Sequence, residues 1–221
     1  MFRRTEILLG DKINKLFDAN IIVFGIGGVG GYSTEMLIRS GVGSITLVDY
    51  DKVDISNKNR QIIALDSTIG KYKVDVMKDR LLDINKDAKV TIIKEKLTPE
   101  NIESFHLENY DYVIDAIDMV TSKIALIKYC FDKNIPIISA MGAGNRMDIP
   151  KFEVTDIYKT YNDGLAKVLR NNLKKLGVTS HKVVFTSNIA TPNGDTIGSI
   201  AYYPAMCGCV LSAYVLGELT K

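Results

Sequence analysis

Three charged residues, well separated along the chain, are of the types that handle phosphates: Arg60, Lys73 and Asp118. An arginine guanidinium binds a phosphate through two parallel hydrogen bonds, and a lysine ammonium adds a compact positive charge. An aspartate suits Mg²⁺, which binds phosphates together with one or two carboxylates and several waters. Taken alone, Arg60 and Lys73 are more typical of solvated surface charges, and Asp118 is more typical of a helix cap. Their chemistry depends on whether the fold brings them together.

A glycine-rich run, GIGGVG at residues 25–30, follows an apolar segment and precedes a helical pattern. This order of strand, turn and helix places the first backbone N–H groups of the helix where they can bind an anion. We expect Gly25 to permit the turn, and Gly27 and Gly28 to let a phosphate approach the backbone. Gly30 would allow the helix to lie close to the strand. The run therefore predicts a nucleotide-binding loop.

Two acidic residues, Asp49 and Asp51, follow the next predicted strand. At this position an acidic side chain can bind the ribose hydroxyls of a nucleotide. The segment 51–69 is long, irregular and polar, and such connections are usually functional lids. If it folds back over the strand ends, Arg60 and Lys73 would join the same site.

Strands and helices alternate through the first two thirds of the chain, after an amphipathic lead-in over 1–19. Strands are expected at 21–25, 44–49, 89–94, 111–115 and 135–140, and helices at 28–40, 71–85, 99–107 (N-capped by Thr98) and 121–133. This alternation predicts an α/β fold with a doubly wound, mostly parallel, Rossmann-like sheet. Ligands of such sheets bind beyond the carboxyl ends of the strands. The glycine run, Asp49, Asp118 and the turn at 142–146 all follow such ends.

The alternation changes after residue 150. Strands are expected at 152–158, 181–187 and 198–203, and helices at 165–176 and 204–220, as an antiparallel C-terminal extension. We expect a single domain over 1–221, with a nucleotide-binding part over about 20–145 and the extension over about 146–221. Lys167, Arg170 and Lys174 share one helix face. That face is either a solvated surface or a site for an anionic partner.

The composition argues against a secreted, membrane-spanning, disulfide-stabilised or zinc-binding protein. The chain has 221 residues, a net charge of +2 and no apolar N-terminal segment of signal-peptide type. No apolar stretch is long enough for a membrane span, so we expect a cytoplasmic protein without membrane contact. The cysteines Cys130, Cys207 and Cys209 form neither a disulfide framework nor a set of four zinc ligands. We therefore expect no zinc.

Five motifs together resemble the adenylating domain of the ubiquitin-activating (E1-like, ThiF-type) superfamily. They are GIGGVG at 25–30, DYD at 49–51, SNKNRQ at 56–61, GKYK at 70–73 and DAID at 115–118. Members of this superfamily bind ATP rather than NAD and adenylate carboxylates. The resemblance implies that ATP is bound by the glycine run, with Asp49 at the ribose, Asp51 beside it, and Arg60 and Lys73 at the phosphates. It also implies nearby roles for Asn57 and Gln61, and Mg²⁺ at Asp118.

A second set of motifs resembles one branch of the superfamily, the dehydratases of N6-threonylcarbamoyladenosine in tRNA. The set comprises RTE at 4–6, GAGNRMD at 142–148, FEVTDIYKT at 152–160 and LAKVLR at 165–170. The resemblance implies an ATP-dependent ring closure at tRNA position 37 through an acyl-adenylate. The partner would be tRNA carrying this nucleoside, bound by the basic residues Arg146, Lys167, Arg170 and Lys174.

In E1-like homodimers an N-terminal arginine reaches the ATP of the partner subunit, which implies this role in trans for Arg4. The chain departs from many members at Asp163 and Gly164, where those proteins have Cys-Pro or Asp-Pro. An obligatory covalent cysteine at this position is therefore not expected.

Three other functions remain open on sequence alone. An adenylyltransferase acting on the C-terminus of a ubiquitin-like or sulfur-carrier protein would share the ATP site, although such enzymes usually carry paired C-x-x-C zinc ligands. An NAD-dependent oxidoreductase would explain the glycine run and Asp49 but would leave Arg60, Lys73 and Asp118 unused. A non-catalytic, nucleotide-gated tRNA-binding protein would bind ATP without releasing AMP.

Overall fold

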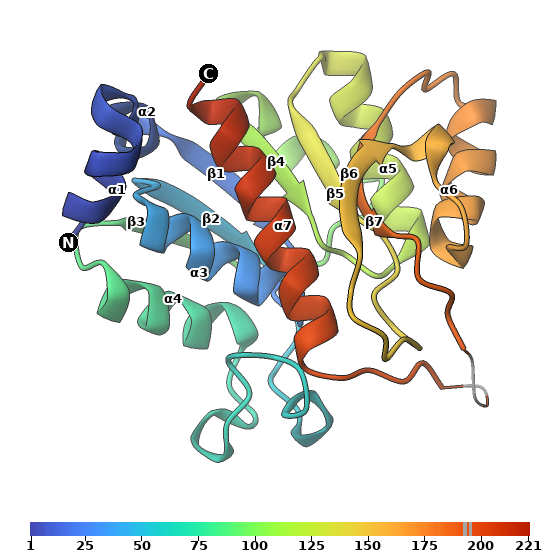
Figure 1. Cartoon of the computed structure of the whole chain (residues 1–221), viewed down its shortest axis with the longest axis horizontal. Helices are drawn as coiled ribbons and strands as arrows, with labels where there is room; N and C mark the ends of the chain where they lie inside the picture. The colour runs from blue at the N-terminus through green and yellow to red at the C-terminus, as the bar shows by residue number, and fades with distance from the viewer. Residues whose placement is uncertain (192–193, 195) are drawn as a thin grey trace.

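A computed structural model describes residues 1–191, 194 and 196–221. Its core is one continuous sheet of seven described strands in the order β3-β2-β1-β4-β5-β7-β6 (Figure 1). The strands are β1 (Asn20–Phe24), β2 (Ser44–Val48), β3 (Lys89–Ile93), β4 (Tyr112–Asp115), β5 (Ile137–Ala140), β6 (Phe152–Asp156) and β7 (Lys182–Thr186). All neighbouring pairs are parallel except β6 and β7. The predicted α/β fold and antiparallel extension are confirmed.

Helices cover both faces of the sheet, as a doubly wound fold requires. They are α3 (Gly30–Ser40), α4 (Lys73–Ile84), α5 (Val120–Lys133), α6 (Gly164–Lys175) and α7 (Tyr202–Leu219). In β1, Ile21 and Val23 face the core beneath α3, α4 and α7, whereas Ile22 and Phe24 face the core beneath α5. The near-continuous apolar run of this strand thus follows from burial on both faces. A third core, with Leu169 of α6, packs between α5, α6 and β7.

The N-terminal lead-in is two short helices, α1 (Arg3–Leu9) and α2 (Ile13–Asp18), separated by a 3₁₀ turn at Gly10–Lys12. Helix α2 buries Ile13 and Leu16 against the core. No side chain of α1 is buried in the described part of the protein, and Ile7 and Leu8 are exposed. Only the second half of the predicted amphipathic segment therefore packs inward.

Two sequence predictions of secondary structure are wrong. Residues 99–107 form no α-helix: the chain makes two 3₁₀ turns, Ile102–Phe105 and Leu107–Asn109. Thr98 does not cap them, because its own N–H is bound at 2.8 Å by the side-chain oxygen of Asn101. Residues 198–203 form no strand, because they are loop and the first turn of α7. The backbone there bonds to other loops, with Asn145 N–H donating to the Gly198 carbonyl.

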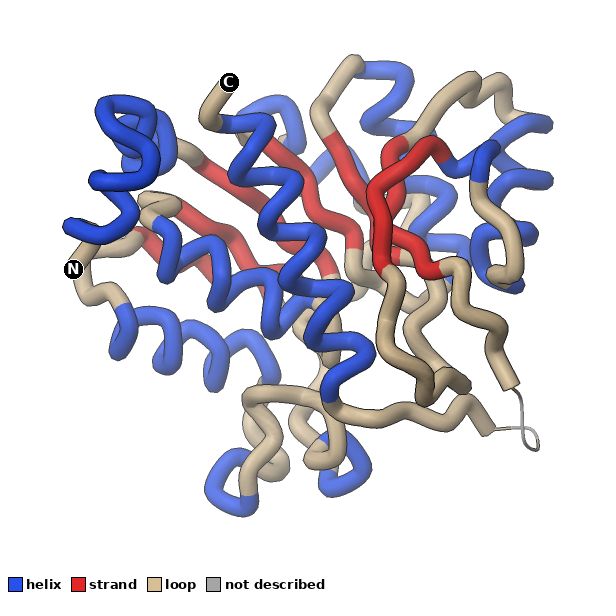
Figure 2. Tube along the Cα trace, viewed as in Figure 1, coloured by secondary structure: helices blue, strands red, loops and turns tan. Residues whose placement is uncertain are grey.

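The loops that leave the carboxyl ends of the strands gather at one end of the molecule (Figure 2). Three of them come from the glycine run and from the segments after β4 and β5. The C-terminal half joins them through the segment before α7. In the described residues, no helix is long and apolar enough to cross a membrane.

Candidate functional site

A cavity of about 590 Å³ opens where the carboxyl ends of the parallel strands meet. Its walls include the glycine run, the end of β2, and the turns after β4 and β5. The sequence-predicted residues that line it are Gly25, Gly27, Gly28, Asp49, Asp51, Arg60, Gln61, Lys73 and Asp118. The fold therefore brings together residues that lie as far as 93 positions apart between Gly25 and Asp118.

Close backbone approaches explain two glycines of the run. Gly25 has φ of +88°, and a Cβ there would lie 2.6 Å from the Ala116 carbonyl oxygen in the turn after β4. A Cβ on Gly30 would lie 1.8 Å from the carbonyl oxygen of Gly25. The glycine run thus packs against the turn after β4, and α3 packs against the glycine run. Only glycine permits these close approaches, because it has no Cβ. Gly30 packs behind the loop instead of facing the cavity.

Asp49 ties the end of β2 to the glycine run. One of its carboxylate oxygens accepts from the Ile26 N–H at 2.7 Å, and the other accepts from the Asp51 N–H at 2.8 Å. Burial raises the pKa of the Asp49 carboxyl, and the nearby Lys73 ammonium opposes this shift. Each carboxylate oxygen can accept more than one hydrogen bond. Asp49 therefore keeps acceptor capacity toward the cavity while it shapes the loop.

Lys73 is buried at the start of α4 and pairs with Asp51, Nζ to Oδ2 at 2.7 Å. The backbone repeats this link, since Lys73 N–H donates to the Asp51 carbonyl at 3.0 Å. The 51–72 segment is thus closed at its base, and Val53 N–H also donates to the Lys71 carbonyl. A closed loop of this kind projects its middle, with Arg60, over the strand ends.

Arg60 and Gln61 stand at the tip of that loop, next to the glycine run. The Arg60 guanidinium donates to the Ser56 carbonyl and to the Asn59 side chain, both groups of its own loop. Gln61 is 7% exposed, and its Oε1 is buried without a hydrogen-bond partner in the described part of the chain. A buried acceptor without a partner is costly, so a ligand donor is expected beside it.

Asn57 and Asp118 differ in where they point. Asn57 is buried, caps the turn at Ile55–Asn57 with Asp54, and does not line the cavity as the described residues define it. Asp118 is exposed on the cavity wall, and no hydrogen bond or ion pair engages its carboxylate within the described residues. Asn57 thus shapes the loop that carries Arg60, and Asp118 is available to a ligand or cation.

Several lining residues carried no local sequence signal. An apolar slot beside Asp118 is formed by Leu97, Met119 and Val120, while the C-terminal segment contributes Ile197, Ser199 and Pro204. Pro204 lies against the glycine run, 3.2 Å from where a Cβ on Gly28 would stand. Ile197, Ser199 and Pro204 follow the glycine run by more than 160 positions, so only long-range packing places them there.

The comparisons with known proteins agree with this geometry. The model of the ThiF family matches residues 4–221. The chain therefore belongs to the ThiF family.

Two full-length relatives bear the same name. The tRNA threonylcarbamoyladenosine dehydratase of Bacillus subtilis is 39% identical over 240 aligned residues, which span 100% of this chain and 94% of the relative. The crystal structure of the E. coli tRNA N6-threonylcarbamoyladenosine dehydratase in complex with ATP matches with a TM-score of 0.93 and 38% identity. That match covers 99% of this chain and 93% of the E. coli chain. The molybdopterin-synthase adenylyltransferase of Salmonella typhimurium is 35% identical, but only over 60% of this chain.

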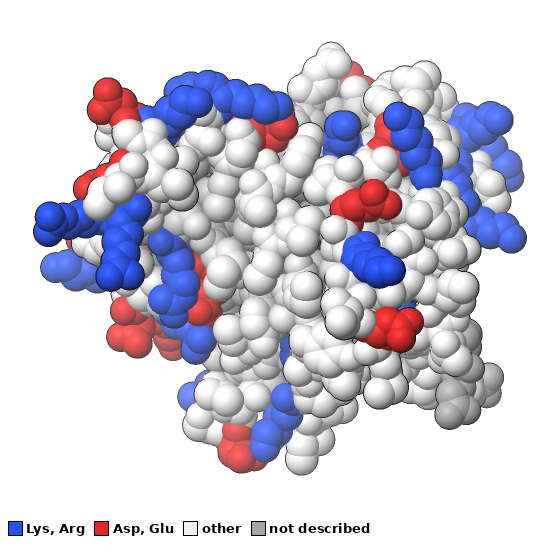
Figure 3. Space-filling model, in the orientation of Figure 1, with Lys and Arg blue, Asp and Glu red and all other residues white. Residues whose placement is uncertain are grey.

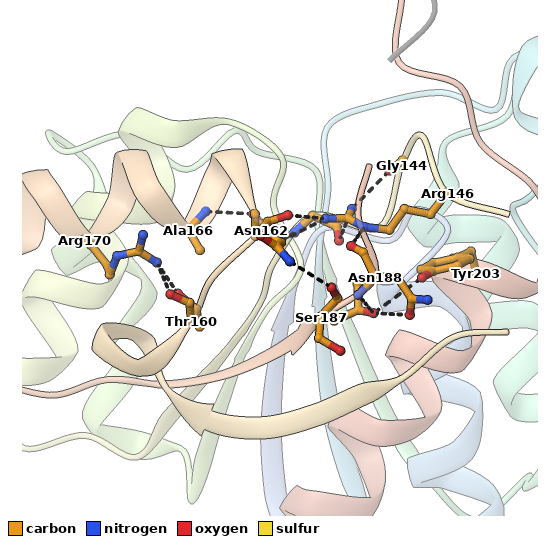
Figure 4. A network of polar contacts seen from close by, with 12 residues as sticks. Gly144, Arg146, Thr160, Asn162, Ala166, Arg170, Ser187, Asn188 and Tyr203 are labelled. Atoms are coloured by element: carbon orange, nitrogen blue, oxygen red, sulfur yellow. Dashed lines mark hydrogen bonds and ion pairs between the residues drawn. The ribbon is translucent and has the colours of Figure 1, made fainter. Parts of the chain in front are cut away.

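Arg146 of this ThiF-family chain is not an exposed cation, in contrast to the basic surface residue that its sequence position indicated. Its guanidinium is buried and donates to four main-chain carbonyl oxygens (Figure 4), those of Gly142, Gly144, Asn162 and Asn188. It also lies 3.8 Å from the carboxylate of Asp163. Arg146 therefore holds the turn after β5 in shape and has no free face for a phosphate.

Asp163 makes two structural contacts at the start of α6. One carboxylate oxygen accepts from the Ala166 N–H at 2.9 Å and caps α6. The other accepts from the Gly142 N–H at 2.9 Å. Together with Arg146, Asp163 fixes α6 to the turn that forms one wall of the cavity.

Basic residues of α6 remain on the surface, with one exception. Lys167 and Lys174 are exposed. Arg170 is half-buried and donates to the carbonyl and hydroxyl oxygens of Thr160. Leu165, in the first turn of α6, lines the cavity. The helix thus begins at the cavity and carries its three exposed lysines, Lys167, Lys174 and Lys175, away from it.

Two of the three cysteines, Cys130 and Cys207, are buried, whereas Cys209 is exposed. Cys207 is fully buried, and burial raises the pKa of its thiol to about 12. Burial likewise raises the pKa of the Cys130 thiol to about 12. Within the described residues, no group of three or more His, Cys, Asp and Glu side chains is arranged to hold a metal ion.

Proposed function

We propose that this protein is an ATP-dependent tRNA threonylcarbamoyladenosine dehydratase. The observation that carries the proposal is the match to proteins of that name over the whole chain, combined with a cavity lined by the glycine run, Asp49, Arg60, Lys73 and Asp118. The adenylyltransferase alternative is less well supported, because two relatives of that name match 60% and 74% of the chain, against 100% for the Bacillus subtilis dehydratase.

ATP would lie with its phosphates on the glycine run and its ribose at Asp49. The glycine run before α3 lines the cavity, and its backbone N–H groups would bind the phosphates. Lys73 at the start of α4 and Arg60 in the 51–72 loop would supply positive charge, and Gln61, whose Oε1 has no partner among the described residues, lines the same space. The apolar slot of Leu97, Met119 and Val120 suits the faces of an adenine base. Asp51 holds Lys73 in place.

Asp118 would hold Mg²⁺ against the phosphates. Its carboxylate is exposed on the cavity wall and unengaged among the described residues, which fits an ion that binds through one carboxylate, phosphate oxygens and waters. When bound, the ion would neutralise charge that develops on the phosphates. Arg60, Lys73 and the backbone N–H groups would orient the triphosphate.

The reaction would proceed in two displacements. An oxygen of the substrate carboxylate attacks the α-phosphorus of ATP, the bond from this phosphorus to the bridging oxygen breaks, and pyrophosphate leaves. A neighbouring atom of the same modified nucleoside then attacks the acyl carbon, loses its proton, and expels AMP with the carboxylate oxygen. The nucleoside has lost one water. Ring closure is intramolecular, so proximity supplies much of its rate and no enzyme thiol is required.

The tRNA would approach along α6. Lys167 and Lys174 are exposed on this helix, Arg170 lies between them, and Leu165 connects the helix to the cavity. Arg146 would act indirectly, by holding the cavity wall on which the modified base rests. In this arrangement residues 20–145 bind the nucleotide and residues 146–221 face the tRNA in the cytoplasm.

A homodimer would use the outer face of α7. Tyr202, Met206, Cys209 and Ala213 recur at helical spacing and are exposed, although the helix is apolar on all sides. The surface in the middle of Figure 3 accordingly shows few charged side chains, whereas charges gather at its edges. Arg4 lies on α1 and does not line the cavity of its own chain in the described structure. A role at the ATP of the partner subunit is therefore compatible with its position.

The test is mass spectrometry of nucleosides from threonylcarbamoylated tRNA incubated with the protein, ATP and Mg²⁺. We expect an ATP-dependent loss of one water from the modified adenosine, with release of AMP. Pyrophosphate exchange that depends on the C-terminus of a small carrier protein, with the nucleoside unchanged, would identify the adenylyltransferase instead. ATP binding without either reaction would indicate a nucleotide-gated tRNA-binding protein. Binding of NAD in preference to ATP would indicate an oxidoreductase.

A further inference from the structure

We propose that a buried ion pair between Asp115 and Lys123 is a positioning device that sets the place of the Asp118 carboxylate on the cavity wall. The inference rests on the proposed function in one respect, that Asp118 serves Mg²⁺ and ATP. Neither Asp115 nor Lys123 lines the cavity in the described structure, so both would act through the turn that carries Asp118.

The pair is completely enclosed. The side chains of Asp115 and Lys123 are both 0% exposed, and Lys123 Nζ lies 2.7 Å from Asp115 Oδ2. Asp115 is the last residue of β4, and Lys123 is in the first turns of α5. The pair therefore joins the end of the strand to the start of the helix, on either side of residues 116–119.

The second oxygen of Asp115 holds that turn directly. Its Oδ1 accepts from the Ile117 N–H at 3.1 Å, one residue before Asp118. The turn is also fixed from the other side, because the Ala116 N–H donates to the Phe24 carbonyl at 2.8 Å and Gly25 packs on the Ala116 carbonyl. Asp115 thus connects the turn to Lys123, and the glycine run presses on the same turn.

Stability alone does not explain a pair of this kind. Burying two charges costs desolvation that an equally sized apolar pair would avoid, whereas removing one partner leaves the other charge uncompensated. An apolar residue at Asp115 could not accept from the Ile117 N–H, and a carboxylate there without Lys123 would be an unpaired buried charge. The two residues together give the turn a fixed acceptor in the interior. The ion pair therefore serves to fix the position of the Asp118 carboxylate.

The molecule contains a matched control away from the cavity. Glu35 of α3 is also a buried carboxylate, and it pairs with Arg39 at 2.8 Å and Arg80 at 2.6 Å. None of these three residues lines the cavity in the described structure. Arg80→Met therefore removes a cationic partner of a buried carboxylate, as Lys123→Met does, without touching the turn at 116–119.

The experiment compares Lys123→Met and Arg80→Met in two measurements on the full chain. Hydrogen exchange of residues 116–119, measured without substrate, reports the order of the turn. The Mg²⁺ concentration for half-maximal ATP-dependent dehydration reports how well the turn positions Asp118 for Mg²⁺. For Lys123→Met we expect exchange about tenfold faster at these residues, as local opening becomes easier. We also expect a Mg²⁺ requirement raised about fivefold, as looser positioning weakens Asp118. Arg80→Met should change neither.

A Lys123→Met protein that unfolds more easily, yet keeps wild-type exchange at 116–119 and a wild-type Mg²⁺ requirement, would overturn the proposal. If that variant does not fold, Asp115→Asn serves instead, because its amide oxygen can still accept from the Ile117 N–H while the ion pair is lost. An unchanged Mg²⁺ requirement in that variant would equally contradict the inference. If the wild-type protein shows no dehydration, the proposed function fails, and the exchange measurement still decides whether the pair orders the turn.

Discussion

The charged residues on the two sides of the cavity are used in opposite ways. On the β1–β4 side, Arg60 bonds only to its own loop, Asp118 is exposed, and Gln61 keeps a buried acceptor without a partner in the described structure. On the β5–β7 side, Arg146 and Asp163 are buried and bonded to the protein itself. On one side the polar groups are available to a ligand, and on the other side they bind the protein's own backbone.

The contrast between the two sides of the cavity shows that the type of a residue does not by itself reveal whether it binds a ligand. Arg60 and Arg146 both follow strand-end segments at the cavity, and both looked equally suited to an anionic ligand from sequence. Burial separates them, because the Arg146 guanidinium is enclosed by the protein and four carbonyl oxygens, where a phosphate cannot reach it. Perturbing each side should therefore produce different losses.

The largest effect is expected for Arg146→Met. The substitution would leave four carbonyl oxygens and the buried Asp163 carboxylate with fewer partners. The free energy of unfolding should fall by about 3 kcal/mol, the scale for breaking a buried pair. Urea denaturation followed by circular dichroism measures it. A variant as stable as wild type would show that the β5–β7 side does not depend on this network.

Arg60→Ala should give the converse result. We expect ATP-dependent dehydration to slow by about 10²-fold, the scale for removing one donor to developing charge, with unfolding unchanged. Steady-state rates and thermal unfolding are measured on the same samples. Arg39→Ala, a half-exposed arginine of α3 outside the cavity, is the control and should keep full activity. Unchanged cyclisation in Arg60→Ala would refute the role given to this residue.

The buried histidine of the β5–β7 side predicts a pH dependence of stability. His181 bonds to the Ser139 hydroxyl at 2.8 Å, and burial, with the charge of Lys123, lowers its pKa to about 3. Because the unfolded chain binds the proton more readily, stability is fully present above about pH 6.5 and is lost as the pH falls toward 3. The expected slope is at most about 1.4 kcal/mol per pH unit.

Urea denaturation at a series of pH values tests this slope. His181→Gln should flatten it, whereas His106→Gln, at the exposed second histidine, should not. If both variants keep the wild-type slope, a group other than His181 causes the loss of stability at low pH, and the prediction is wrong.

The smallest effect is expected on the exposed face of α6. Reversing Lys167 and Lys174 to glutamate should weaken tRNA binding by about tenfold at low salt and make it less salt-dependent, because phosphate contacts release counterions. Filter binding at several salt concentrations measures both quantities. Reversing two exposed lysines outside α6 together, Lys86→Glu and Lys133→Glu, is the control, because it changes the net charge by the same amount. Unchanged tRNA affinity in the α6 variant would remove this face as the tRNA surface.

Sequence patterns were sufficient where the determining contacts are local. The apolar run before GIGGVG, the alternation of elements and the acidic end of β2 specify a doubly wound sheet with a nucleotide-type loop. Short-range rules also placed Asp49, Lys73 and Asp118 at strand ends or helix starts that meet at one edge of the sheet. The predicted helix at 99–107 failed because Asn101 offers the backbone a competing side-chain bond.

Only the tertiary structure decided which of these polar groups are free. Arg146 is buried because the segment around Asn188, some 40 residues later, lies against it, and the cavity is closed by Ile197 and Pro204 from the far end of the chain. Gln61 has no described partner because its loop folds onto the glycine run. Burial depends on which distant segments pack together, and no local pattern carries that information.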